Sequence, residues 1–153
     1  MAGVPQPEDR TPEGVTYLDH TADVGVRVVG RNADEAFVRA AAAVFARMVD
    51  LDRVAPSAEH AVSICSDALD GLLVDWLGAL LAEKDVSGLV FGRFEVQIAE
   101  TADGYRLDGV ARGEPIAASR HRIGVEVKGI SYLGLAVRRE RGGETSAEFV
   151  LDV

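Results

Sequence analysis

The clearest pattern in the chain is a stripe of large apolar residues in its middle third. Spacings of three residues and one residue alternate along the stripe, so its members share one face of a helix. Its members are Leu69, Leu72, Leu73, Trp76, Leu77, Leu80 and Leu81. Asp67 stands just before the stripe, where a capping residue is expected. The pattern predicts a helix that buries this face and its tryptophan.

An earlier segment also predicts a helix, over about residues 33–49. Asn32 followed three residues later by Glu35 resembles a capping box. Apolar side chains then recur at spacings of four, three and four residues, which is a helical period. They are Phe37, Ala41, Val44 and Met48.

The rest of the chain alternates with period two or carries short β-branched runs, both typical of strands. The expected strands cover residues 15–18, 24–29, 61–65, 94–98, 105–108, 130–137 and 148–153. Asp103-Gly104 and Gly142-Gly143 predict hairpin turns. Residues 113–115 (Gly-Glu-Pro) are expected to break the strand that follows the first of these turns. The short links favour an α+β fold, with two helices packed on a largely antiparallel β-sheet.

Length and composition indicate one domain. The chain has 153 residues, of which 48% are hydrophobic and 27% charged, as in ordinary globular proteins. Residues 1–13 hold three prolines among polar side chains and are expected to form a mobile tail, which leaves 14–153 as the folded domain. The net charge of −9 disfavours direct tight binding of nucleic acid and favours a partner with a basic face.

Cysteine usage and hydropathy bear on the compartment. Cys65 is the single cysteine, which excludes an internal disulfide and a multi-thiolate zinc site and indicates a reducing compartment. No apolar run reaches the ~18 residues that a membrane-spanning helix needs. We therefore expect a cytoplasmic protein with no membrane association.

Two short segments carry candidate chemistry. Asp19-His20-Thr21-Ala22-Asp23 lies between two expected strands, either as an ordinary turn or as an acid/base pair or part of an oxygen-ligand metal site. At the chain end, Asp152 lies among four apolar residues and next to the terminal carboxylate of Val153. These anions repel each other unless a cation such as a hard divalent metal lies between them, and the alternative is a frayed, solvated end.

Other catalytic signals are weak. Lys128 is one of two lysines and either holds a phosphate or carboxylate or is an ordinary surface lysine. His60 and His121 lack partners at metal-ligand spacing, and neither a phosphate-binding glycine loop nor a nucleophile elbow occurs. The sequence therefore disfavours an independent enzyme, and no catalytic residue is assigned.

Five segments in order resemble the archease family. They are 20–25 (His-Thr-Ala-Asp-Val-Gly), Ala36-Phe37, 72–77 (Leu-Leu-Val-Asp-Trp-Leu), 128–132 (Lys-Gly-Ile-Ser-Tyr) and 151–153 (Leu-Asp-Val). The likeness spans residues 15–153 and implies a single archease-like domain. The chain departs from the family at Ser131-Tyr132-Leu133, where Thr-Tyr-His is common, so no role of that histidine is carried over.

The resemblance implies a function. Archeases help the tRNA-splicing RNA ligase of the RtcB type to acquire guanylate and turn over repeatedly, and they are not ligases themselves. The family also implies a divalent cation, most simply Ca²⁺, with Mg²⁺ or Mn²⁺ as options, held here by Asp23, Asp152 and Val153. One alternative is a chaperone-like modulator of another tRNA-processing enzyme, such as a methyltransferase. Another is a hydrolase that uses Asp19, His20 and Asp23.

Overall fold

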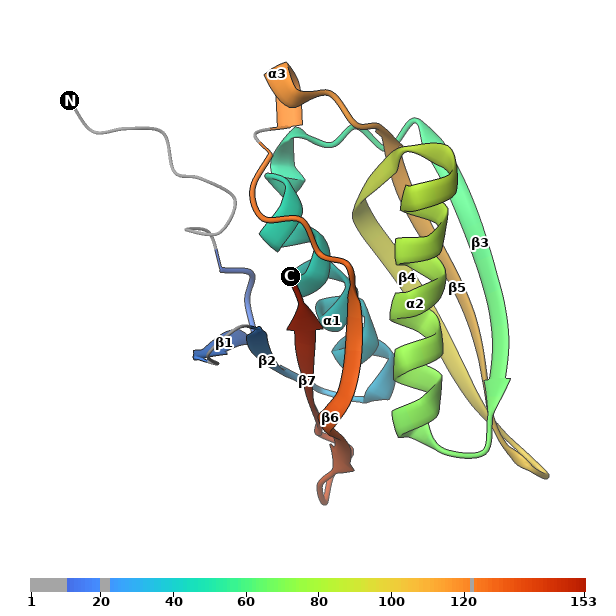
Figure 1. Cartoon of the computed structure of the whole chain (residues 1–153). Coiled ribbons are helices and arrows are strands. Elements are labelled where there is room, and N and C mark those ends of the chain that lie inside the picture. Colours follow the sequence, from blue (N-terminus) through green and yellow to red (C-terminus); the bar gives the residue numbers. More distant parts are fainter. Residues whose placement is uncertain (1–10, 20–22, 122) are drawn as a thin grey trace.

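A computed structural model describes residues 11–19, 23–121 and 123–153 (Figure 1). Most of the predicted tail, 1–13, lies outside the described residues. The elements are β1 (Val15–Asp19), β2 (Val24–Gly30), α1 (Ala33–Met48), the 3₁₀ helix η2 (Leu51–Arg53), β3 (Ala58–Ser66), α2 (Leu69–Ser87), β4 (Leu89–Thr101), β5 (Gly104–Pro115), α3 (Ala118–His121), β6 (Gly129–Arg139) and β7 (Thr145–Asp152).

The strands form two antiparallel sheets with the two long helices between them (Figure 1). One sheet has the order β1-β2-β7-β6 and the other has the order β3-β5-β4. Helix α1 packs against β2, β7 and β4, and α2 packs against β6, β3 and β5. The predicted α+β class with antiparallel pairing is therefore confirmed, and the strands divide into two sheets.

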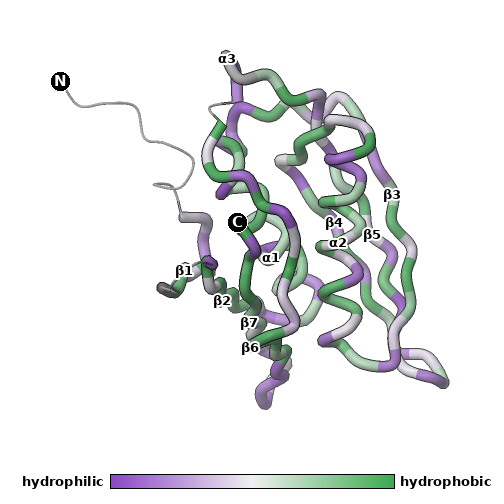
Figure 2. Tube along the Cα trace, in the orientation of Figure 1, coloured by the Kyte–Doolittle hydropathy of each residue, from purple (hydrophilic) through white to green (hydrophobic). Residues whose placement is uncertain are grey.

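The residues of α1 explain why one sheet does not suffice. Besides the predicted apolar face, the helix buries Ala40, Ala43 and Phe45, so apolar surface extends around much of its circumference. A helix that is apolar on two sides needs cover on both. Figure 2 shows that the strands of the two sheets differ in pattern. β2 and β7 are largely hydrophobic, whereas hydrophobic and hydrophilic residues alternate along β3.

Both helices occupy the predicted segments. The Asn32 side chain caps α1 by accepting the Glu35 N–H at 2.9 Å, as the pattern predicts. All seven stripe residues of α2 are buried. The prediction that Asp67 caps α2 is wrong, because β3 continues to Ser66 and the turn that follows puts Ala68 at the N-cap, without a side-chain capping bond.

The hairpin of β4 and β5 is longer than its alternating pattern. The predicted break at residues 113–115 is wrong, since β5 continues to Pro115, which pairs with Leu89. Gly113 is part of that pairing: a Cβ there would lie 1.8 Å from the Val90 carbonyl oxygen. Glycine thus permits a close approach of the two strands beside the irregularity at Phe91 and Arg93.

Candidate metal centre

The antiparallel pairing of β2 with β7 brings the two ends of the sequence together. Val24 pairs with Leu151. Continuing this register by one residue would set Asp23, just before β2, beside Asp152, the last residue of β7. Directly opposed residues of an antiparallel pair have Cβ atoms about 4.5–5.5 Å apart and point to the same face. The pairing of the two segments that this convergence requires is observed. The convergence of the two side chains stays a prediction.

Strand β6 borders the same position from the other side of β7. Gly129 pairs with Asp152, and the Lys128 N–H donates a hydrogen bond of 2.7 Å to the Asp152 carbonyl oxygen. A Cβ at Gly129 would meet nothing within 4 Å, so this flank is open. Lys128, which the sequence analysis names, therefore directly precedes the strand that borders Asp152.

The turn that carries Asp23 starts from an anchored strand. The Tyr17 hydroxyl in β1 donates a 2.9 Å hydrogen bond to the Ala43 carbonyl oxygen of α1. The Arg47 guanidinium lies over the Tyr17 ring, 4.9 Å from its centroid. Burial raises the pKa of Tyr17 to about 12, and the positive charge of Arg47 opposes that shift. The phenol stays protonated and keeps β1 fixed on α1.

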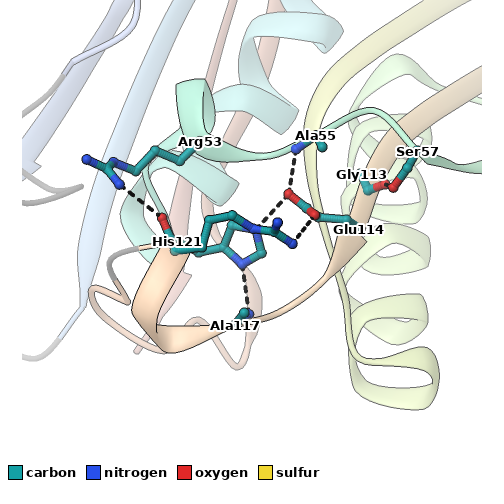
Figure 3. A network of polar contacts seen from close by, with 8 residues as sticks. Arg53, Ala55, Ser57, Gly113, Glu114, Ala117 and His121 are labelled. Carbon is teal, nitrogen blue, oxygen red and sulfur yellow. Dashed lines mark hydrogen bonds and ion pairs between the residues drawn. The ribbon is translucent and has the colours of Figure 1, made fainter.

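The connection that delivers Lys128 is held by a buried carboxylate (Figure 3). Glu114 is 4% exposed and accepts hydrogen bonds from the Ala55 N–H at 2.6 Å and from His121 Nε2 at 2.9 Å. It is also paired with Arg120. These three donors, the Ala55 N–H above all, hold the pKa of Glu114 below its ordinary value.

His121 is fully buried, and its protonation state follows from its contacts. Its Nδ1 accepts the Ala117 N–H at 2.8 Å and so carries no proton. The ring hydrogen is therefore on Nε2, which donates to Glu114. No metal-ligand partner was expected for His121, and its hydrogen bond with Glu114 holds α3 against β5. The one sequence signal for this contact is Glu114, which lies seven residues before His121 near the end of β5.

The same connection completes the end of α1. The carbonyl oxygens of Arg47 and Met48, which have no partner within the helix, accept the N–H groups of Val125 and Gly124 at 2.9 and 2.7 Å. Val127 is then buried at 2% exposure. These contacts fix the path of the chain up to Lys128, and with it the flank of Asp152.

The donor set at this place is small and oxygen-rich. Asp23 is half-buried, Asp152 is exposed and Val153 is half-buried. Within the described ranges, no group of three or more His, Cys, Asp or Glu side chains could hold a metal ion. Two carboxylates with a backbone oxygen and water suit a hard cation such as Ca²⁺ or Mg²⁺, and lack the nitrogen or sulfur ligands that zinc favours. The types of donor atom here are those that a hard cation takes, and the binding of such a cation stays a prediction.

Other sequence candidates fall elsewhere. His20 and residues 21–22 lie outside the described residues. The acid/base alternative that uses Asp19, His20 and Asp23 therefore falls partly outside them as well. His60 Nδ1 lies 3.8 Å from Glu83 Oε2, far along the chain from Asp152. Asp70, in the first turn of α2, accepts the Val137 N–H of β6 at 3.1 Å. No helix in the described part of the chain is long and apolar enough to cross a membrane.

Comparison with known proteins identifies relatives along almost the whole chain. Residues 16–153 match the model of the Archease protein family (MTH1598/TM1083). The chain is 38% identical over 137 residues to protein archease of Thermococcus gammatolerans, covering 90% of this chain and 96% of the relative. It is 37% identical over 136 residues to protein archease of Methanopyrus kandleri, covering 89% and 96%. The solution structure of Methanobacterium thermoautotrophicum protein 1598 superposes with a TM-score of 0.81 at 36% identity, over 92% of this chain and 99% of that one.

Proposed function

The chain belongs to the archease family, and from this premise we propose that it activates a tRNA-splicing RNA ligase of the RtcB type. Membership of the family supports an accessory role in tRNA processing. In the finer proposal, the chain promotes guanylylation of the ligase and its multiple turnover without being a ligase itself. The expected cytoplasmic location is part of this proposal.

The observation that carries the proposal is the register of β2 on β7. It pairs Val24 with Leu151, and its continuation by one residue would bring Asp23 beside Asp152, with the start of β6 on the far side of Asp152. Carboxylates of this kind repel each other at close range unless a cation lies between them. A pair of acidic side chains kept at the open end of a sheet, away from the core, favours a binding role over a structural one.

A divalent cation is the proposed cofactor, with Ca²⁺ the first choice and Mg²⁺ or Mn²⁺ as options. Asp23 and Asp152 would supply carboxylate oxygens and Val153 a further oxygen, with water completing the shell. When bound, such a cation supplies positive charge on an otherwise acidic surface. The Lys128 N–H donates a hydrogen bond to the Asp152 carbonyl oxygen and so positions this proposed ligand.

The proposal is tested by guanylylation of a purified RtcB-type ligase with GTP, with and without this chain. We expect the chain to raise the rate of guanylate transfer and the number of ligations per ligase molecule. Equal rates with and without the chain would contradict the proposal. Stimulation of a tRNA methyltransferase instead would favour the chaperone-like alternative, and turnover of substrate by the chain alone would favour a hydrolase.

A further inference from the structure

Strand β6 exposes two consecutive large apolar side chains, Tyr132 and Leu133, which we name the bulge patch. Tyr132 is 70% exposed and Leu133 is 79% exposed. Across the described parts of the chain, these are the only two exposed large apolar residues that are adjacent in sequence. Isolated apolar residues on a surface are ordinary, but an adjacent tyrosine and leucine form a contiguous apolar feature.

The bulge patch is lifted out of the sheet by an irregular register. Ser131 pairs with Val150 and Ala136 pairs with Glu148, so residues 132–135 stand opposite Phe149 alone. Gly134 has a φ of +76°, and the Leu133 N–H is held by the Ser131 hydroxyl at 3.1 Å. A bulge with its own local hydrogen bond is a built feature of a strand. It presents the two side chains without exposing the core beneath them.

The bulge patch lies on the strand that borders the candidate metal centre, since Gly129, three residues before Tyr132, pairs with Asp152. The strand β7 that faces it carries the exposed Glu148 in its middle and the exposed Asp152 at its end. Glu148 forms an ion pair with Arg27 at 3.5 Å. In the continued register of β2 on β7, the cross-strand neighbour of Asp152 would be Asp23. The exposed Lys128 also borders Asp152, and the proposed cation would offset the two aspartates. The charge that a partner meets is therefore the net charge of the chain, −9.

This charge selects among possible occupants. A symmetric second copy would bring together two chains that each carry a net charge of −9, and an anionic membrane would be repelled by the same charge. An enzyme that handles RNA has a basic surface for phosphates and so matches an acidic chain. Tyrosine is also enriched among the residues that dominate binding at protein interfaces.

We propose that the bulge patch is the apolar anchor of the interface with the RNA ligase, seated in an apolar pocket rimmed by Lys or Arg of that enzyme. This inference rests on the proposed function and adds to it the surface through which the ligase is bound. The anchor sets affinity, while the metal centre beside it sets the extent of activation.

The experiment measures binding of the full chain to the purified ligase by titration calorimetry, alongside guanylylation at increasing concentrations of the chain. The test variant is Tyr132→Ser/Leu133→Ser. The matched control is Val86→Ser, because Val86 is 83% exposed in the last turn of α2. Since neither position is in the core, the melting temperature of both variants should stay within about 2 °C of the parent.

We expect the double variant to bind the ligase about tenfold or more weakly, with Val86→Ser unchanged. Full stimulation should return when the double variant is supplied in excess. Unchanged affinity of the double variant, with a parent chain that binds and stimulates, would overturn the anchor and leave the proposed function standing. Self-association lost in the double variant, without effect on ligase binding, would assign the patch to a second copy and also overturn it. A parent chain that neither binds nor stimulates the ligase would overturn the proposed function itself.

Discussion

The indole Nε1 of Trp76 in α2 donates a hydrogen bond of 3.1 Å to the carbonyl oxygen of Phe37 in α1. Both side chains are fully buried. The two helices make few other direct contacts, because each packs mainly on the sheets. This bond satisfies the one polar group of a large apolar side chain and fixes the helices relative to each other.

We predict that Trp76→Ala lowers the free energy of unfolding by about 3–5 kcal/mol. Trp76→Phe keeps most of the apolar volume but loses the indole N–H, so its loss should be smaller. Urea unfolding followed by circular dichroism measures both. A loss below about 1 kcal/mol for Trp76→Ala would be incompatible with a buried indole.

A glycine on β5 depends on the same indole. A Cβ at Gly109 would lie 2.7 Å from Trp76 Cζ3, and the aromatic ring has no room to retreat. We predict that Gly109→Ala destabilises the fold by about 1–3 kcal/mol through overpacking. The control is Gly78→Ala in α2, where a Cβ meets nothing within 4 Å. That variant should gain about 0.5–1 kcal/mol from helix propensity, and equal effects of the two would contradict the packing argument.

The sequence predicted the elements well where one residue pattern dominates. The α2 stripe and the Asn32 cap of α1 follow from periods and local hydrogen bonding, which depend on neighbours in the chain. The convergence of Asp23 with Asp152 was expected from the family resemblance and an isolated acidic end. The pairing of β2 with β7 that this convergence requires is present in the fold.

The features that were missed depend on distant partners. Asp67 is a reasonable cap by type, but the length of β3 decides which residue reaches that position. Gly113 was interpreted as a strand breaker, whereas its missing Cβ makes room for the Val90 carbonyl of another strand. Glu114 and His121 are partners because α3 folds back against β5. No local pattern encodes such contacts.

The contacts of Glu114 with Ala55, Arg120 and His121 predict that the stability of the fold depends on pH. Its pKa is lowered in the fold, so its contribution is present above the ordinary glutamate pKa of about 4.3 and is lost as the pH falls through the lower folded-state value. We predict that Glu114→Gln is less stable than the parent near neutral pH and that the difference shrinks on acidification. The urea midpoints of Glu114→Gln and the parent, near neutral pH and after acidification, measure this difference. Glu126→Gln, an exposed site in the same connection, should show little difference at either pH.

Charge predicts how the chain meets its partner. A chain with a net charge of −9 approaching an RNA-binding enzyme is drawn in by long-range attraction. We predict that added salt slows association with the ligase more than it speeds dissociation, as measured by stopped-flow or surface-based kinetics. An association rate indifferent to salt would assign the acidic surface to solvation alone. Tight binding of tRNA by the isolated chain would contradict the charge argument.

The metal centre makes the sharpest prediction about function. Asp23→Ala, Asp152→Ala and an extension after Val153 should each reduce ligase activation by about tenfold or more, because each removes or crowds an oxygen ligand. A tag before Met1 should have little effect. The fold should persist in each variant, since removing one carboxylate relieves the repulsion between Asp23 and Asp152 and offsets part of the lost contact.

Calcium binding by calorimetry and guanylylation of the ligase should fall together in these variants. Glu144→Ala provides the control, because Glu144 is exposed in the turn before β7 and lies at the far end of that strand from Asp152. If the Asp23→Ala/Asp152→Ala double variant activated the ligase fully, the carboxylates would not form a functional centre, whatever cation they bind. If instead the double variant lost calcium binding but kept activation, the cation would be separable from the function, and the paired carboxylates would act on the ligase directly or not at all.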